Sequence, residues 1–218
     1  MDRTPRIGRA YRLLRGAYGR QHWWPADTPF EVCIGAILTQ STSWANVEKA
    51  VLNLKGADAL SIEGIMSASP ARLGRLIRPS LYYNVKARKL KEFARYLQSV
   101  YGGDLSKMQR CRMSGLRKEL LGVWGIGPET ADSILLYALS KPSFVVDAYT
   151  KRIFSRMGLI RSDAPYEEVK GLFESNLPGS VSVYNEYHAL IVEHAKRSCM
   201  KRPSCKGCCL AKLCAKRI

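Results

Sequence analysis

Residues 120–147 constrain the fold and function of this chain more than any other stretch. A Gly125-Ile126-Gly127 turn precedes Pro128, which suits a first helical position because the N–H there has no internal partner. Apolar residues three and four positions apart predict one buried helix face, formed by Ala131, Ile134, Leu135 and Ala138. A short apolar run then leads to Asp147, and a further helix is predicted from Ala148 to about Met157.

This stretch has two interpretations. In the simpler one it is two capped helices, with Asp147 as an ordinary N-cap. In the functional one, the two glycines let the backbone approach a phosphate with its amide groups pointing at it. The hairpin, the following Thr130-Ala131 and the Val-Asp pair resemble the endonuclease III superfamily of DNA glycosylases. The resemblance implies that Gly125, Ile126 and Gly127 contact DNA and that Asp147 is catalytic.

The charge of the chain agrees with a nucleic-acid partner. The 218 residues include 35 Lys and Arg against 18 Asp and Glu, a formal net charge of +17. This charge predicts a polyanionic partner, most simply nucleic acid. The superfamily resemblance implies that this partner is double-stranded DNA with a damaged base. No apolar run is long enough to span a bilayer, and the basic N-terminus lacks the apolar core of a secretory signal. We expect a monomer in a prokaryotic cytoplasm, acting at the nucleoid.

The hydrophobic patterns indicate an all-α fold, because helical periodicity recurs and strand alternation does not. Beyond Asp147, helices are predicted over Tyr166–Leu177 and Val181–Arg197. The resemblance implies a two-lobed helix-hairpin-helix glycosylase with a six-helix barrel over residues 29–140. Residues 1–28 and 141–218 would form the second lobe, and a cleft between the lobes would hold Asp147.

The C-terminal cysteines are spaced for a metal centre. Four thiolates this close in sequence can surround one zinc ion or a cubane cluster, and they are Cys199, Cys205, Cys208 and Cys214. The pattern resembles the endonuclease III cluster loop with a first gap one residue shorter, which favours a [4Fe-4S] cluster over zinc. Cys209 is an alternative ligand, and His188 and His194 are alternatives for zinc. The resemblance and the charges together place Lys201, Arg202 and Lys206 against the DNA backbone.

The second residue after the Gly125-Ile126-Gly127 hairpin indicates the type of glycosylase. Bifunctional members of the superfamily carry a lysine there, which attacks the sugar and permits strand cleavage. This chain has Glu129, and a carboxylate cannot form an imine. We therefore predict a monofunctional enzyme without lyase activity, which releases a base and leaves an abasic site.

Two aromatic segments indicate the lesion. The Trp-Trp-Pro at residues 23–25 and the Phe30–Trp44 segment resemble the 3-methyladenine DNA glycosylase III branch. The resemblance places Trp24, Trp44 and Glu129 in the base pocket, lets Gln40 reach into the duplex, and leaves Trp23 in the core. Aromatic faces suit a cationic alkylated purine, which also leaves the sugar easily.

The segment Ile77–Leu90 also resembles the superfamily, with Leu81 where glycine is usual and Asn84 as the expected cap of a long helix. Three functions stay open at this point. The first is an alkylpurine glycosylase, and the second is a monofunctional glycosylase for uracil or mispaired thymine. The third is a non-catalytic DNA-binding helix-hairpin-helix protein, which would have no need of Asp147.

Overall fold

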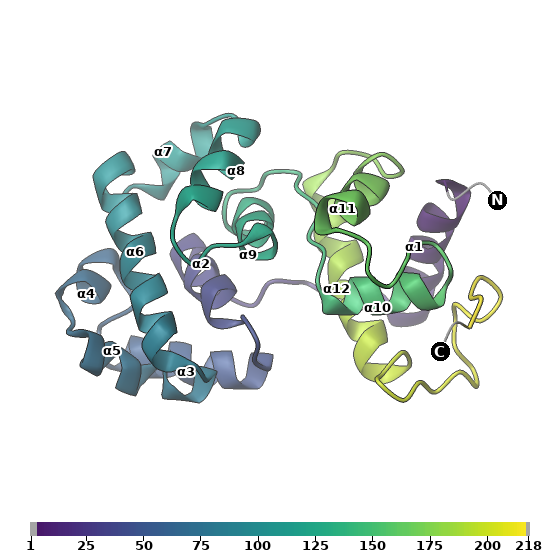
Figure 1. Cartoon of the computed structure of the whole chain (residues 1–218), viewed down its shortest axis with the longest axis horizontal. Helices are drawn as coiled ribbons and strands as arrows, with labels where there is room; N and C mark the ends of the chain where they lie inside the picture. Colours follow the sequence, from purple (N-terminus) through teal and green to yellow (C-terminus); the bar gives the residue numbers. More distant parts are fainter. Residues whose placement is uncertain (1–3, 217–218) are drawn as a thin grey trace. The chain divides into compact units, whose positions relative to one another are not determined.

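The computed structural model describes residues 4–216 of the chain, and within them it contains helices and no β-strand (Figure 1). The predicted all-α class is therefore confirmed. The chain divides into two compact units, which we call the terminal unit (Met1–Pro25 with Pro142–Ile218) and the central unit (Ala26–Lys141). No helix among residues 4–216 has the length and apolar character needed to cross a bilayer.

The central unit is a bundle of short and long helices around α2. In chain order its helices are α2 (Pro29–Leu38), α3 (Trp44–Gly56), α4 (Ile62–Ser67), α5 (Pro70–Leu76), the 3-10 turn η1 (Arg78–Ser80), α6 (Tyr83–Tyr101), α7 (Leu105–Arg110), α8 (Met113–Gly122), α9 (Pro128–Ser133) and the π-helical turn η2 (Ile134–Ala138). Helix α2 is buried from Glu31 to Leu38 and packs against α3, α6, α9 and η2.

Local sequence signals explain where α2 begins. The Thr28 hydroxyl accepts a hydrogen bond from the Glu31 amide at 3.1 Å, and the Glu31 carboxylate accepts one from the Asp27 amide at 3.1 Å. This reciprocal arrangement satisfies donors that a helix start leaves without partners. Because α2 then ends at Leu38, Gln40 is held two residues beyond the most buried helix of the unit.

The start of α6 differs from the sequence prediction. Asn84 was expected to cap this helix, but α6 begins at Tyr83 and the cap position is Tyr82. Tyr82 has left-handed backbone angles (φ 45°, ψ 31°), and Leu81 before it has φ 62° and ψ 165°. The chain therefore turns into α6 through two non-glycine residues with positive φ.

The terminal unit contains α1 (Thr4–Tyr18), α10 (Ala148–Arg156), α11 (Tyr166–Glu174) and α12 (Val181–Arg197). Helix α12 has the predicted bounds, whereas α11 ends three residues before the predicted Leu177. Stacked and edge-to-face rings fill its core, with the Phe144 and Phe173 centroids 4.2 Å apart. The aromatic residues of this core are Phe144, Phe154, Phe173, Tyr184 and Tyr187.

Residues 144–146 form an extended segment within this core, and Asp147 follows it as the N-cap of α10. Residues 144–146 are almost fully buried. The Phe144 amide donates to the Glu174 carboxylate at 2.9 Å, and the Val146 amide donates to the Tyr166 hydroxyl at 3.3 Å. Because side chains of α11 satisfy these buried amides, the run stays extended without a neighbouring strand. Asp147 is thus fixed at the end of a buried and hydrogen-bonded segment.

Candidate active site

The hairpin in the central unit needs glycine at one of its two positions. Gly125 has φ +87°, and a Cβ added there would overlap the side chain of Lys89. Gly127 has φ −95°, and a Cβ there would meet nothing within 4 Å. The side chain of Ile126 is buried between them. The Gly125 backbone therefore requires glycine for folding, while the absence of a side chain at Gly127 leaves open space beside the backbone.

Helix α9 begins at this open position. Gly127 is its N-cap and Pro128 its first residue, and within the described part of the chain no side chain caps this end. The first amide groups of the helix are therefore available to an external acceptor. The Glu129 side chain, which occupies the position of the superfamily lysine, is exposed. The backbone geometry suits an anionic ligand such as a phosphate.

Gln40 is hydrogen-bonded to residues on both sides of this hairpin. Its side-chain amide donates to the Gly125 carbonyl at 3.1 Å and to the Thr130 hydroxyl at 2.9 Å. Its carbonyl oxygen accepts a hydrogen bond from the Lys89 ammonium. The superfamily resemblance implies that Gln40 contacts DNA. In this structure it links the end of α2 to both sides of the hairpin turn.

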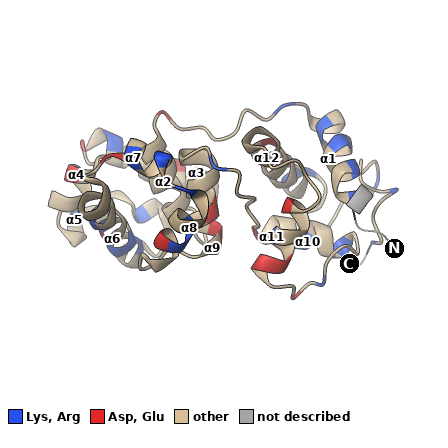
Figure 2. Cartoon of the chain, turned by 90° about the horizontal axis from the view of Figure 1, so that it is seen from above, with Lys and Arg blue, Asp and Glu red and all other residues tan. Residues whose placement is uncertain are grey.

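Trp124, directly before the hairpin, is a feature that the sequence analysis missed. Its side chain is 46% exposed, and the Arg88 guanidinium lies 4.0 Å from its ring centroid. This cation–π contact brings a positive charge of α6 to the hairpin. Lys and Arg occur on helices of both units, α6 and α1 among them (Figure 2). A tryptophan with high exposure next to a Gly-x-Gly turn is the signal that could have identified it.

Asp147 lies in the terminal unit as the N-cap of α10. Its Oδ1 accepts hydrogen bonds from the Thr150 amide at 2.7 Å and the Thr150 hydroxyl at 2.8 Å. Its Oδ2 lies 3.6 Å from Nε2 of His188 on α12. His188 was an alternative zinc ligand in the sequence analysis. Its imidazole lies beside the candidate catalytic carboxylate, and His188 is not among the residues that line the space between the cysteines.

The surroundings of Asp147 favour its ionised form. Burial raises the pKa of the carboxyl group, but the contacts with His188 and Thr150 outweigh burial and lower the pKa below its ordinary value. The side chains of Asp147 and His188 are 13% and 8% exposed. A carboxylate that stays charged in such a dry setting interacts strongly with a nearby cation. This property is the one required beside an oxocarbenium-like sugar.

The candidate pocket tryptophans belong to different units. Trp24 is half-buried in the terminal unit, where its ring meets Trp23 edge-on at a centroid distance of 5.6 Å. Trp44 is half-buried in the central unit as the first residue of α3. The expected core position of Trp23 is wrong, because its side chain is also half-buried and Lys196 lies 6.0 Å above its ring.

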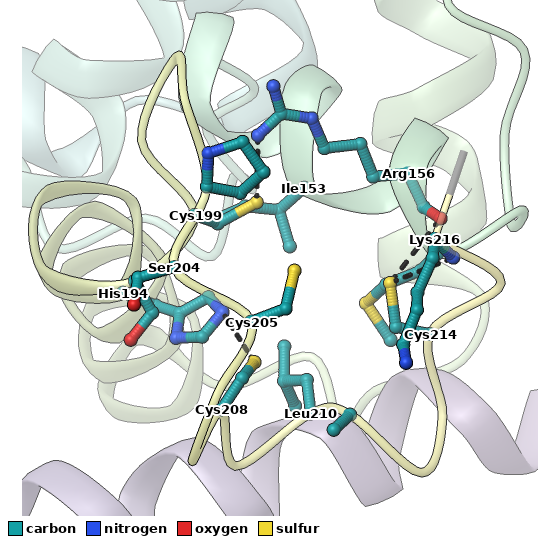
Figure 3. Close-up of a pocket in the computed structure, with 14 residues that line it drawn as sticks. Ile153, Arg156, His194, Cys199, Ser204, Cys205, Cys208, Leu210, Cys214 and Lys216 are labelled. Carbon is teal, nitrogen blue, oxygen red and sulfur yellow. Dashed lines mark hydrogen bonds between the residues drawn. The ribbon is translucent and has the colours of Figure 1, made fainter. Parts of the chain in front are cut away.

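The C-terminal loop brings four cysteines to one space (Figure 3). Ile153 and Leu210 contribute apolar surface to the same space. The four thiols that line it are those of Cys199, Cys205, Cys208 and Cys214. Cys209 does not line it, and its sulfur lies 4.0 Å from Nδ1 of His194. The geometry thus separates Cys209 from the four cysteines of the predicted set.

N–H groups donate to two of these four sulfurs, and a histidine nitrogen approaches a third. Arg156 Nη1 donates to Cys199 Sγ at 3.3 Å, and the Lys216 amide donates to Cys214 Sγ at 3.3 Å. His194 Nε2 lies 3.7 Å from Cys208 Sγ, and burial lowers the pKa of His194 to about 4, which keeps it neutral. Among residues 4–216, no group of three or more His, Cys, Asp or Glu side chains is arranged so that it could hold a metal ion. The basic residues assigned to DNA in this loop, Lys201, Arg202 and Lys206, are exposed.

Comparison with known proteins identifies the family. Residues 34–178 match the model of the HhH-GPD superfamily of base excision DNA repair proteins. A provisionally named DNA repair glycosylase of Methanocaldococcus jannaschii is 50% identical over 210 residues, covering 95% of each chain. Endonuclease III of Thermotoga maritima is 32% identical over 187 residues, covering 85% of this chain and 82% of its own.

Two solved structures share the fold. The 3-methyladenine DNA glycosylase MagIII of H. pylori, bound to 1,N6-ethenoadenine, is 28% identical, with a TM-score of 0.78 over 90% of this chain and 98% of its own. An endonuclease III–DNA complex has a TM-score of 0.85 at 22% identity, over 99% of this chain and 97% of its own. This chain therefore belongs to the HhH-GPD superfamily. It is a base excision repair DNA glycosylase.

Proposed function

We propose that this glycosylase is monofunctional and excises alkylated purines such as 3-methyladenine from double-stranded DNA, leaving an abasic site. The observation that carries the proposal is that Asp147 is buried and ionised, while the sequence has Glu129 where the superfamily resemblance implies a lysine. Such a site can stabilise a sugar cation but has no amine where the covalent step needs one. The first experiment is a base-release screen over duplexes with methylated, deaminated and oxidised bases.

Asp147 supplies the chemistry in this proposal. Cleavage breaks the bond between C1′ and the base nitrogen, and the electron pair leaves with the base. The carboxylate stabilises the positive charge that develops on the sugar, then accepts a proton from the water that adds to C1′. Because Thr150 already occupies Oδ1 with two hydrogen bonds, Oδ2 is the oxygen that we assign to the reaction.

The absence of lyase activity has a direct test. Lys151 is the nearest amine to Asp147 in sequence, but its ammonium donates to the Ala164 carbonyl at 2.8 Å. Lys86 has a pKa lowered by burial to about 8, yet it donates to the Leu38 and Ser80 carbonyls at 2.8 and 2.5 Å. We expect borohydride to trap no covalent complex on lesion DNA. Efficient trapping would contradict the proposal and make Lys151 the first suspect.

Two aromatic residues support an alkylated purine as the substrate. We assign Trp24 and Trp44 to the extruded base, because each is half-buried and can offer an indole face. A cationic ring gains from such a face, and the gain increases as water is excluded. The relative that binds 1,N6-ethenoadenine is a 3-methyladenine glycosylase, which is consistent with a modified adenine as the ligand.

The four cysteines of the C-terminal loop support a second candidate substrate class, because they distinguish this chain from the branch that its aromatic motifs resemble. The 3-methyladenine glycosylase III branch that the aromatic motifs resemble typically lacks the four cysteines found here. A monofunctional enzyme for uracil, or for thymine mispaired with guanine, would fit the same Glu129 and Asp147. The base-release screen separates the two: faster release of methylated purine supports the first proposal, and faster release of uracil or mispaired thymine supports the second.

DNA contacts are assigned to the hairpin and the cysteine loop. The open space at Gly127 supports backbone contact with a phosphate by residues 125–127. Gln40 would have to exchange its hairpin hydrogen bonds for contacts in the duplex. The exposed Lys201, Arg202 and Lys206 are assigned to the phosphate backbone.

We also propose that the four lining cysteines hold a [4Fe-4S] cluster. All four cysteines line one space, and four thiolates are the ligand set of such a cluster. The resemblance of their spacing to the endonuclease III cluster loop favours the cluster over a zinc ion. Bound there, the cluster would cross-link the loop and fix its basic residues. Iron and sulfide in cluster-like proportion in anaerobically purified protein would support this assignment. Zinc without iron would contradict it.

A further inference from the structure

The inference concerns His188 and rests on the proposed role of Asp147. We infer that His188 is the positioning residue of this active site, whose imidazole holds the reactive Oδ2 of Asp147 in place. The distance from His188 Nε2 to Oδ2 is 3.6 Å. Both side chains are almost completely buried, and they come from two different helices of the terminal unit.

The capping bonds of Asp147 fix only one of its two carboxylate oxygens. The Thr150 amide and hydroxyl both bind Oδ1, so one carboxylate oxygen is fixed by α10 itself. The hydrogen bonds by which Thr150 of α10 contacts Asp147 both end on Oδ1, and neither of them fixes the direction of Oδ2. His188 restricts that remaining freedom from the side of α12. The reactive oxygen is thereby aimed before DNA binds, and such preorganisation lowers the cost of reaching the transition state.

The two helices that carry the pair are joined rigidly. Arg152 on α10 donates through Nε to the Cys199 carbonyl at 2.9 Å and through Nη2 to the Ala195 carbonyl at 3.3 Å. These bonds tie α10 to the end of α12 and the start of the cysteine loop. Catalytic groups keep their geometry best when regular elements with fixed contacts support them. His188 and Asp147 are supported in this way.

The other charged side chains of α10 are directed to other partners. Lys151 donates to the Ala164 carbonyl, and Arg156 donates to the carbonyls of Met200 and Lys201. His188 is therefore the ionisable group that accounts for the electrostatic support of the Asp147 carboxylate.

Two variants of His188 test the inference. His188→Leu keeps the volume and removes the polar contact, and His188→Gln keeps an N–H donor. In single-turnover assays on duplexes with 3-methyladenine and with uracil, we expect His188→Leu to lower base release by about 10²-fold, the scale of a 1 Å misplacement. His188→Gln should recover most of the rate, and DNA affinity should stay unchanged in both. Val192→Ala, a cavity in the same helix, controls for lost stability.

A spectroscopic measurement keeps the test independent of activity. The pKa of the Asp147 carboxyl group can be followed by NMR in protein labelled at its aspartate carboxyl carbons, with Asp147→Asn used for assignment. We expect the pKa to rise in His188→Leu and to stay unchanged in Val192→Ala. If the wild type releases neither base, the proposed function fails while this shift still decides the inference. An unshifted pKa, or a full release rate in His188→Leu, would overturn it.

Discussion

Helices α9 and α10 begin in opposite ways, and the difference matches the separate roles that we propose for them in DNA binding and in chemistry. At α9 the cap is Gly127, and no side chain of the described residues accepts from its first amide groups. At α10 the cap is Asp147, whose carboxylate accepts from the Thr150 amide and hydroxyl. Every helix start has amide groups without internal partners. The start of α9 has no side-chain cap, and the start of α10 is capped by the Asp147 carboxylate.

The same comparison explains why glycine and aspartate are not interchangeable here. If the α9 start binds a phosphate as proposed, a carboxylate at position 127 would fill that space and repel the phosphate. If Asp147 is catalytic as proposed, a glycine at position 147 would leave the reacting sugar without a fixed negative charge. The two helix ends also differ in support, since the hairpin depends on Gln40 within the central unit and Asp147 depends on the aromatic core of the terminal unit. Each can therefore be disrupted separately.

Replacing the charge at the closed end should have the largest effect. Asp147→Asn keeps a capping oxygen for Thr150 but loses the carboxylate. We expect base release to fall by about 10²–10⁴-fold, the range for a positioned acid–base group, while DNA binding and far-UV circular dichroism are retained. The measurement is the single-turnover rate on the best substrate of the screen. Retention of that rate would exclude Asp147 as the catalytic group.

The same variant gives a pH dependence of stability. The folded-state pKa of Asp147 is lowered, so its stabilising effect is present above the unfolded value and is lost as pH falls through the folded value. Wild type should therefore be more stable than Asp147→Asn at neutral pH. The difference in free energy of unfolding should shrink as the pH falls below 3.8, the ordinary value for this carboxyl. A constant difference across this range would contradict the ionised assignment.

The open end should respond differently at its two glycines. Gly125→Ala places a Cβ at φ +87° against the Lys89 side chain, so we expect a loss of about 1–3 kcal/mol of stability. Gly127→Ala meets no neighbour within 4 Å and should leave the thermal midpoint almost unchanged. It should still weaken DNA binding, because the new methyl group occupies the proposed phosphate position. Equal DNA affinity of Gly127→Ala and wild type would contradict backbone contact at this point.

At a third helix start, that of α6, we expect a substitution to glycine to increase stability. Leu81 has φ 62° and ψ 165°, a combination that costs a non-glycine residue about 1–3 kcal/mol. Its side chain is 50% exposed and contributes little burial. Leu81→Gly should therefore raise the free energy of unfolding by about 1 kcal/mol after the greater unfolded-state entropy of glycine is subtracted. Leu81→Ala is the control and should give no gain, because alanine has the same backbone restriction.

The sequence predicted the long elements well, because they carry their own signals. Helix α12 has the predicted bounds, and Asp147 opens α10 as expected. Helices α4 and α7 have six residues each and are too short to show a clear period. The predicted cap of α6 was wrong because the chain enters the helix through Leu81 and Tyr82 at positive φ, which no local pattern indicates.

The contacts of the candidate site were beyond the sequence for a different reason. Gln40 and Thr130 are 90 residues apart, and only the packed bundle makes their hydrogen bond visible. The contact between Asp147 and His188 likewise depends on how α10 and α12 pack. Residue types and spacing identified the side chains that could take part in binding or catalysis. Which of them support each other was decided by packing over long sequence separations.

The smallest effects should come from the basic cysteine loop, and they sharpen the distinction between binding and chemistry. Lys206 is exposed and assigned to the phosphate backbone. If Lys206 neutralises one phosphate, Lys206→Ala should reduce the slope of log affinity against log salt by about 0.9 and leave the single-turnover rate unchanged. Arg161→Ala is a matched control, because Arg161 is already paired with Asp163 at 3.2 Å. An equal change of slope in both variants would show a general charge effect, and the Lys206 contact would then be wrong.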